Sequence, residues 1–249
     1  GWEFPHRPTR ETTEATLADA GVERYVALPY VHEPGGARSL NAWLAERAEE
    51  SEPLIPFATV HPDDEDVGGI VRDAFEAGAR GLKFHCPVQA CAPADPRIEP
   101  ALEAAAEYDR PVTYHGGTAP MYTEDPHVGP EPFAEAVESY PDVRVNCAHM
   151  GTYDVAEFVA MAREHDNVYL DTTFAMSTEA EQTMGFDPST IANEVLMELS
   201  ESIMFGSDLP NIPYPYRAER AELLDRDLPT ETYRDIFYRT AEAFLGADA

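Results

Sequence analysis

The chain has 249 residues, of which 43% are hydrophobic, so it is long enough to bury one large core. The 47 Asp and Glu residues against 17 Lys and Arg give a formal net charge of −30, which disfavours nucleic acids and anionic membranes as partners. No apolar run reaches the roughly 18 residues of a membrane span, and the first residues lack the basic-then-apolar pattern of a signal peptide. We therefore expect one α/β domain over residues 1–249, located in the cytoplasm.

The acidic residues are spread evenly along the chain rather than gathered in one tail. Lys83 is the only lysine, and the other cations are arginines. Such a charge repels itself in a folded chain unless salt screens it, because the Debye length falls to about 3 Å at 1 M salt. The composition resembles that of haloarchaeal cytoplasmic proteins, and we expect stability to rise with salt.

Short apolar runs alternate with amphipathic stretches along the whole chain. The runs predict strands at residues 22–28, 54–60, 81–84, 111–114, 143–147, 167–170 and 202–205. The amphipathic stretches predict helices at about 10–20, 37–50, 63–78, 97–109, 130–140, 152–165, 188–200, 215–226 and 230–244. This alternation indicates parallel strands joined by right-handed crossovers.

Seven predicted strands are one fewer than a TIM barrel needs. The fold is therefore either an open doubly wound sheet or a (β/α)8 barrel whose first strand is missing from this chain. The placement of the polar residues favours the barrel. Each predicted strand is followed or ended by a histidine or an aspartate, in chain order His32, His61, His85, His115, His149, Asp171 and Asp208. A barrel gathers these strand ends around one opening, and histidine is the commonest metal ligand, so the pattern predicts a metal-dependent hydrolytic site.

Five segments in chain order resemble motifs of the amidohydrolase-related family. They are Gly81–His85, Arg110–Gly117, Asn146–Gly151, Asn167–Thr173 and Ile203–Pro210, and residues 239–246 resemble the family's last helix. The resemblance covers roughly residues 20–246 and implies a metal-dependent TIM-barrel hydrolase.

The resemblance also implies roles for three of these residues. His115 matches a metal ligand, and Asp208 matches the aspartate that binds both the metal and the nucleophilic water. His149 matches a histidine that is a further ligand or a catalytic group beside the substrate. The implied cofactor is a divalent metal, zinc first, with manganese or iron as alternatives, since a zinc-bound water has a pKa of about 7. Asp208 would accept that water's proton, while the metal and His149 polarise the bond that is attacked.

One departure from the family concerns its first strand, which carries a His-x-His pair of ligands. This sequence has no His-x-His, and His6 stands alone between two prolines. We expect that the natural protein extends upstream and that this chain is incomplete at its N-terminus. A chain without the pair would bind metal weakly, which keeps open a non-catalytic barrel as an alternative.

Five further residues are candidates for substrate binding: Lys83, His85, Tyr122, His127 and Arg217. Lys83 could bridge two metals as a carbamate, or contact substrate or a carboxylate near the barrel mouth. Tyr122 and His127 belong to the long loop after His115, which we interpret as a lid. Arg217 could hold a substrate carboxylate, or simply form an ion pair at a helix start.

The sequence thus predicts an enzyme that cleaves a C–N or C–O bond in a small molecule. Non-oxidative decarboxylation or lactone hydrolysis of a carboxylated ring compound is the alternative, because the same family contains both reactions. We expect no nucleic acid or membrane partner, and a homodimer stays open.

Overall fold

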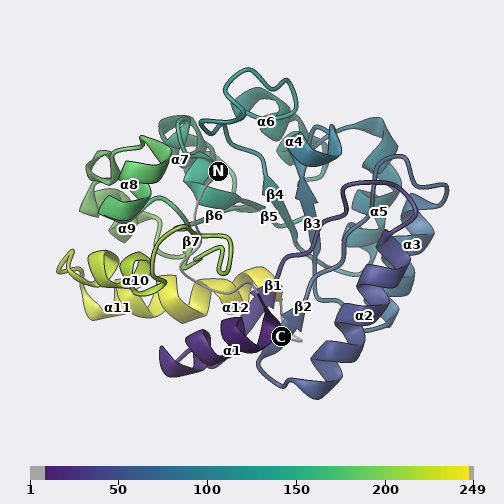
Figure 1. The fold of residues 1–249 in the computed structure, drawn as a ribbon. Helices are drawn as coiled ribbons and strands as arrows, with labels where there is room; N and C mark the ends of the chain where they lie inside the picture. The colour runs from purple at the N-terminus through teal and green to yellow at the C-terminus, as the bar shows by residue number, and fades with distance from the viewer. Residues whose placement is uncertain (1–8, 247–249) are drawn as a thin grey trace.

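The computed structural model describes residues 9–246, and its seven strands are short and parallel (Figure 1). Their bounds are β1 Tyr25–Ala27, β2 Leu54–Pro56, β3 Leu82–His85, β4 Val112–His115, β5 Val145–Cys147, β6 Val168–Asp171 and β7 Ile203–Met204. Strands β1 and β2 pair with each other, and β3 to β7 form a second sheet in chain order. All seven strands lie within the predicted positions or extend past them by one residue.

A single bridge beyond the end of β2 joins the two sheets. The Ala58 N–H donates to the Gly81 carbonyl at 2.8 Å, and the Lys83 N–H donates to the Ala58 carbonyl at 2.9 Å. The strand order therefore runs from β1 to β7 without inversion, which is the order of a TIM barrel and excludes a doubly wound sheet.

Helices surround the strands on the outside (Figure 1). The longer ones are α1 Arg10–Asp19, α2 Ala37–Glu50, α3 Val67–Glu76, α5 Glu99–Glu107, α6 Pro130–Ser139, α7 Val155–Glu164 and α10 Arg217–Leu224. The shorter ones are α4 Cys86–Gln89, α8 Thr178–Met184, α9 Asn193–Glu198, α11 Thr230–Arg234 and α12 Thr240–Leu245. A π-helical turn, Asp235–Arg239, joins α11 to α12, and 3-10 turns lie at Pro96–Ile98, Ala148–Gly151 and Pro188–Thr190. No helix within residues 9–246 is long and apolar enough to cross a membrane.

Most of the helices were predicted, but α4, a single turn, and α8 were not. The longer of these two is α8. Its sequence is mostly polar and lacks the apolar spacing of an amphipathic helix. Local caps define it instead: the Ser177 side chain accepts from the Ala180 N–H, and Gly185 ends the helix in the left-handed conformation.

Alternation along the strands separates a core face from a site face. Leu82 and Phe84 of β3, and Val112 and Tyr114 of β4, are fully buried and belong to the main hydrophobic cluster. Successive strand residues point to opposite faces, so the intervening polar residues share the other face. In register across the sheet these are Lys83 with Thr113, Thr113 with Asn146, Asn146 with Tyr169, and His85 with His115.

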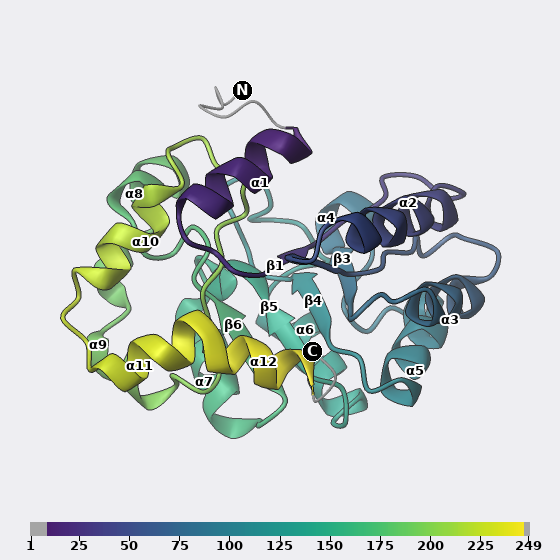
Figure 2. The ribbon, with the colours of Figure 1, turned by 90° about the horizontal axis from the view of Figure 1, so that it is seen from below.

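The barrel strand that the sequence predicts to be missing would lie between β1 and β7, the first and last visible strands. Within residues 9–246, β1 and β7 each pair with one strand only. The Phe205 N–H just after β7 donates instead to the Ile236 carbonyl of the π-helical turn, at 2.8 Å. A second apolar cluster joins Phe57, Met204 and Phe244, so the C-terminal helical segment packs along this seam (Figure 2). His6 lies outside the described residues.

Candidate active site

The first pair of site residues comes from neighbouring strands. His85 ends β3 and His115 ends β4, and the two are register partners. Their imidazole rings stack with centroids 4.3 Å apart and planes 4° apart. Side chains at equivalent positions of adjacent strands lie on the same face, so the register alone places these rings together.

His149 reaches the same place from the 3-10 turn after β5. Its Nε2 atom lies 3.1 Å from Nδ1 of His115. The backbone of His149 is left-handed, with φ 61°, as is that of Met150, with φ 51°. This conformation is costly for residues other than glycine and persists only where neighbours hold it. The turn therefore needs an anchor.

Asp171, the last residue of β6, provides that anchor. Its carboxylate accepts hydrogen bonds from the His149 N–H at 3.1 Å, from Asn146 Nδ2 at 2.9 Å and from the Thr173 N–H at 3.2 Å. Each bond to a buried carboxylate is charge-assisted, so together they fix the turn that carries His149. The sequence indicated only that Asp171 follows a strand, and its anchoring role comes from the structure.

Asp208 and Lys83 form the charged part of the site. Asp208 follows β7 with a left-handed φ of 49°; part of its surface is exposed, but protein atoms crowd it on the other sides. This burial raises the pKa of the Asp208 carboxyl, while the charges of His149 and Lys83 act in the opposite direction. Burial lowers the pKa of the Lys83 amine, opposed by Asp171 and Asp208. Lys83 thus lies within electrostatic reach of both carboxylates.

Two of the imidazoles, those of His85 and His115, are held in their neutral form. Burial lowers the pKa of His85 to about 3, helped by the charge of Lys83, and holds the pKa of His115 well below its ordinary value. Within the described residues, three buried ring nitrogens have no hydrogen-bond partner: Nδ1 of His85, Nε2 of His115 and Nδ1 of His149. Neutral imidazoles with open nitrogens are suited to bind a metal or a substrate proton.

The histidine pair fits part of a metal site. Two nitrogens bound to one tetrahedral zinc lie roughly 3.3 Å apart, close to the 3.1 Å between His149 Nε2 and His115 Nδ1. Within residues 9–246, however, no three His, Cys, Asp or Glu side chains come together as a group that could hold a metal. His115 and His149 therefore fit two ligand positions, and the role of Asp208 as a third ligand stays a prediction.

Aromatic rings form the walls around this pair. Tyr122, on the loop after β4, points its edge at His115 with ring centroids 5.5 Å apart, and at His85 with 5.9 Å. Tyr30 tilts against His85 at 4.6 Å, and Phe174 meets His149 edge-on at 5.6 Å. Of the predicted substrate-binding residues, His85 and Tyr122 are thus in contact with the site.

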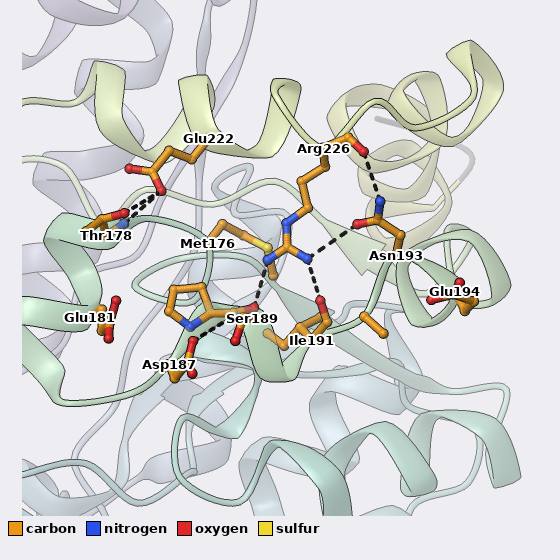
Figure 3. A pocket seen from close by; sticks show the side chains of 12 residues that line it. Met176, Thr178, Glu181, Asp187, Ser189, Ile191, Asn193, Glu194, Glu222 and Arg226 are labelled. Carbon is orange, nitrogen blue, oxygen red and sulfur yellow. Dashed lines mark hydrogen bonds between the residues drawn. The ribbon is translucent and has the colours of Figure 1, made fainter.

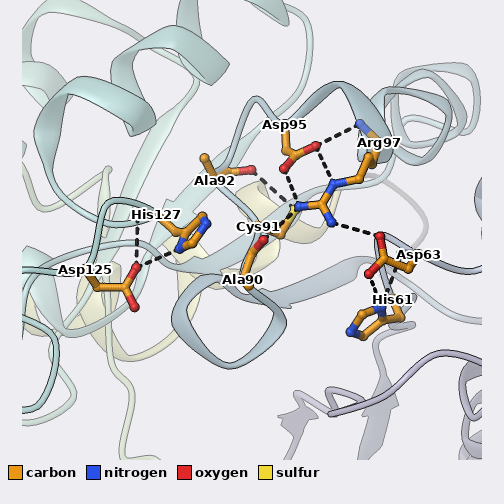
Figure 4. A network of polar contacts seen from close by, with 9 residues as sticks. All are labelled: His61, Asp63, Ala90, Cys91, Ala92, Asp95, Arg97, Asp125 and His127. Atoms are coloured by element: carbon orange, nitrogen blue, oxygen red, sulfur yellow. Dashed lines mark hydrogen bonds and ion pairs between the residues drawn. The ribbon is translucent and has the colours of Figure 1, made fainter.

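His127 and Arg217 are not in contact with it. His127 Nδ1 lies 2.8 Å from Asp125, near the cluster in which Arg97 binds Asp95 and Asp63 (Figure 4). Arg217 begins α10 with an exposed side chain, and within the described residues it makes no hydrogen bond or ion pair with the site. Their proposed contacts with substrate stay predictions.

A separate cavity of about 580 Å³ lies among the outer helices (Figure 3). Residues of the 176–194 segment line it together with Glu222 of α10 and Arg226 beyond the end of α10, and none of the predicted site residues does. Arg226 crosses it and donates to the carbonyls of Pro188, at 2.7 Å, and Ile191. These hydrogen bonds hold the loop before α9. The lining residues show that this cavity is separate from the histidine pair.

A comparison with known protein families identifies the family to which this chain belongs. The sequence profile of the amidohydrolase family matches residues 3–247, which is nearly the whole chain. The chain belongs to the amidohydrolase family. No curated protein matched the sequence of this amidohydrolase.

Solved structures of similar fold support the architecture. An uncharacterized TIM-barrel protein from Bordetella bronchiseptica has a TM-score of 0.76 at 18% identity, covering 95% of this chain and 82% of its own. A 5-carboxyvanillate decarboxylase from Novosphingobium aromaticivorans, complexed with manganese and a nitrobenzoic acid, has a TM-score of 0.65 at 18% identity, with coverages of 93% and 78%. A 2,6-dihydroxybenzoate decarboxylase complexed with 2,6-dihydroxybenzoate has a TM-score of 0.63 at 15% identity, with coverages of 95% and 88%. At these identities the likeness establishes the TIM-barrel fold of this amidohydrolase.

Proposed function

We propose that this protein is a metal-dependent enzyme that removes carbon dioxide from a small carboxylated ring compound. The observation that carries the proposal is the contact between His149 Nε2 and His115 Nδ1, at 3.1 Å, inside a ring of aromatic side chains. The nitrogens supply two ligand positions, and the aromatic rings of Tyr122 and Phe174 beside them suit a planar substrate. The two decarboxylases of similar fold support this choice of reaction.

His115, His149 and Asp208 would hold the metal, with zinc, manganese or iron as the ion. When bound, a divalent ion supplies positive charge that orients and polarises the oxygen atoms of the substrate. A 5-carboxyvanillate decarboxylase of similar fold is described with manganese.

Asp208 is the group that would handle the proton. In a decarboxylation the bond between the ring and its carboxylate breaks, CO2 leaves, and a proton must reach the ring carbon. As an ionised carboxylate beside the bound ion, Asp208 would accept a proton from a substrate group or a water molecule and pass it to the ring carbon. Lys83, Tyr122 and His85 would line the substrate on the sides of β3 and the β4 loop.

Hydrolysis of a C–N or C–O bond, including that of a lactone, is the second candidate. In this reaction Asp208, ionised beside the metal, would accept a proton from the attacking water and pass it to the leaving group. The family assignment supports this reaction as well. A barrel that binds without turnover is the remaining alternative, since the described residues group only two nitrogens at the pair.

The test is a turnover screen of the protein loaded with Mn²⁺ or Zn²⁺. Hydroxylated benzoates, with 5-carboxyvanillate and 2,6-dihydroxybenzoate among them, are assayed for CO2 release, and aromatic lactones and amides for hydrolysis. CO2 release that is lost in Asp208→Asn supports the decarboxylase. Hydrolysis alone supports the second candidate, and metal binding without any turnover supports the non-catalytic barrel.

The acidic composition supports a further proposal, about the cellular environment in which the protein acts. We infer that the enzyme acts in a salt-rich cytoplasm as a single barrel domain, with a small molecule as its partner and neither nucleic acid nor membrane. The net charge of −30 is the basis of this inference. A homodimer is compatible with it.

A further inference from the structure

A buried glutamate lies behind the histidine pair. Glu219 is the third residue of α10, and its side chain is fully buried, with 0% exposure. Its Oε1 atom accepts hydrogen bonds from the Tyr214 hydroxyl and from the Phe174 N–H, the latter at 3.4 Å. Its Oε2 atom is also buried and has no partner within the described chain. A buried carboxyl with one unpaired oxygen needs an explanation.

Phe174 connects this carboxyl to the site. It follows β6 with a left-handed φ of 56°, which is costly for a phenylalanine. Its ring meets His149 edge-on at 5.6 Å and 72°, and on its other side meets Tyr214 at 5.6 Å and 82°. The ring is therefore fixed between the site histidine and a tyrosine bonded to Glu219.

We propose that Glu219 is a positioning residue that sets the orientation of the His149 imidazole through Phe174. One oxygen of Glu219 holds both the backbone of Phe174 and the tyrosine that packs on its ring. Without that oxygen, the Phe174 N–H loses this hydrogen-bond acceptor. Tyr214, which packs on the Phe174 ring, loses the same hydrogen-bond partner. The His149 ring, which packs edge-on against Phe174, then has more than one orientation available.

The hydrogen-bond pattern also allows the protonated form of the Glu219 carboxyl to hold Phe174 and Tyr214. Both donors converge on Oε1, so a proton on Oε2 leaves the two bonds intact. Burial raises the pKa of Glu219 to about 8, which favours that protonated form at neutral pH. Glutamine is then the matched substitute, because its oxygen replaces Oε1 and its amide group replaces Oε2–H.

The inference rests on the proposed function only in giving His149 a role in the reaction, and its main test needs no substrate. Protein labelled with ¹⁵N on histidine is observed by NMR, with the His149 ring signals assigned from His149→Asn. We expect Glu219→Gln to retain the wild-type His149 signals. We expect Glu219→Leu to shift or broaden them beyond recognition while the His165 signals stay in place.

Tyr214→Phe is the second variant, in case Glu219→Leu does not fold. It removes one of the two donors to Oε1 and is expected to shift the His149 signals by a smaller amount. Unchanged His149 signals in a folded Glu219→Leu or in Tyr214→Phe would overturn the proposal. So would equal shifts in Glu219→Gln and Glu219→Leu.

If the turnover screen yields a substrate, a kinetic readout follows. Glu219→Leu should lower kcat by about tenfold or more with little change in KM, because a misplaced reacting group costs rate rather than substrate affinity. Glu219→Gln should restore most of kcat. Absence of any turnover in the wild type contradicts the proposed function alone, since the NMR result judges the positioning role independently.

Discussion

His149 Nε2 lies 3.1 Å from His115 Nδ1, although the two residues are 34 positions apart in the chain. At that distance at most one of the two nitrogens carries a proton, because two N–H groups would repel each other. Burial lowers the pKa of His115 well below its ordinary value, so His115 is neutral at neutral pH. A neutral imidazole is also the form that binds metal ions.

Removing either histidine of the pair should weaken metal binding. We expect His115→Ala and His149→Ala each to lower Mn²⁺ affinity at least about tenfold, because ligand number governs retention of a divalent ion. Isothermal titration calorimetry measures this directly. His165→Ala, at the C-terminal end of α7, is the matched control and should bind like the wild type. Affinities that agree across all four proteins would place the metal elsewhere.

Glu219 should give the protein a pH-dependent stability. With its pKa raised to about 8, the folded protein keeps a proton that the unfolded chain releases above its ordinary pKa. The stabilisation is therefore complete at pH 4 and is lost as the pH rises toward 8. Between pH 5 and pH 8 the wild type should lose roughly 3 kcal/mol more unfolding free energy than Glu219→Gln.

Urea unfolding of both proteins across that range measures the difference. Asp208, whose pKa is also raised, contributes a slope of the same sign, but it is present in both proteins and cancels. Parallel stability curves for the two proteins would mean that Glu219 is ionised in the fold.

Salt should stabilise the fold. Surface ion pairs such as Arg163–Glu198, at 2.7 Å, weaken in salt, but each is worth only about 0–1 kcal/mol. Repulsion within a net charge of −30 acts over the whole surface and is screened by the same salt, so we expect screening to dominate. Thermal melts in low and molar KCl decide between the two effects. A midpoint that stays equal or falls would refute the proposed salt-rich setting.

Gly206, beside Asp208, has no room for a side chain. A Cβ there would lie 2.3 Å from Thr173 Oγ1 and 3.0 Å from Asp171 Oδ1, the oxygen that holds the His149 turn. Gly206→Ala should therefore cost about 1–3 kcal/mol of stability and also weaken Mn²⁺ binding. Gly36→Ala is the control, because its Cβ would meet Val31 at 3.6 Å and the Glu33 carbonyl oxygen at 3.9 Å, both ordinary contact distances. Chemical denaturation and calorimetry test both effects, and equal stabilities would show that the loop gives way without cost.

The sequence by itself determined the strands, their order and the side of the barrel that carries the chemistry. The alternation of Leu82 and Phe84 with Lys83 and His85 separates an apolar face of the strand from a polar one, because the side-chain period of a strand is two. Since parallel strands end at one edge, the position of His115 at the end of its strand predicts that it lies beside its neighbours. These properties are local in the chain, and the structure confirms the fold.

The tertiary structure decided the contacts between distant segments. That His149 turns back onto His115 depends on Asp171, and that Phe174 packs against His149 depends on Glu219, 45 positions further along the chain. Glu219 gives no signal of its own in a chain rich in acidic residues. Likewise, the gap beside β7 was predictable, but its occupant, the turn that contains Ile236, was not. Local patterns fix which face of an element is buried, whereas the partner of a given atom depends on how all the elements close around one core.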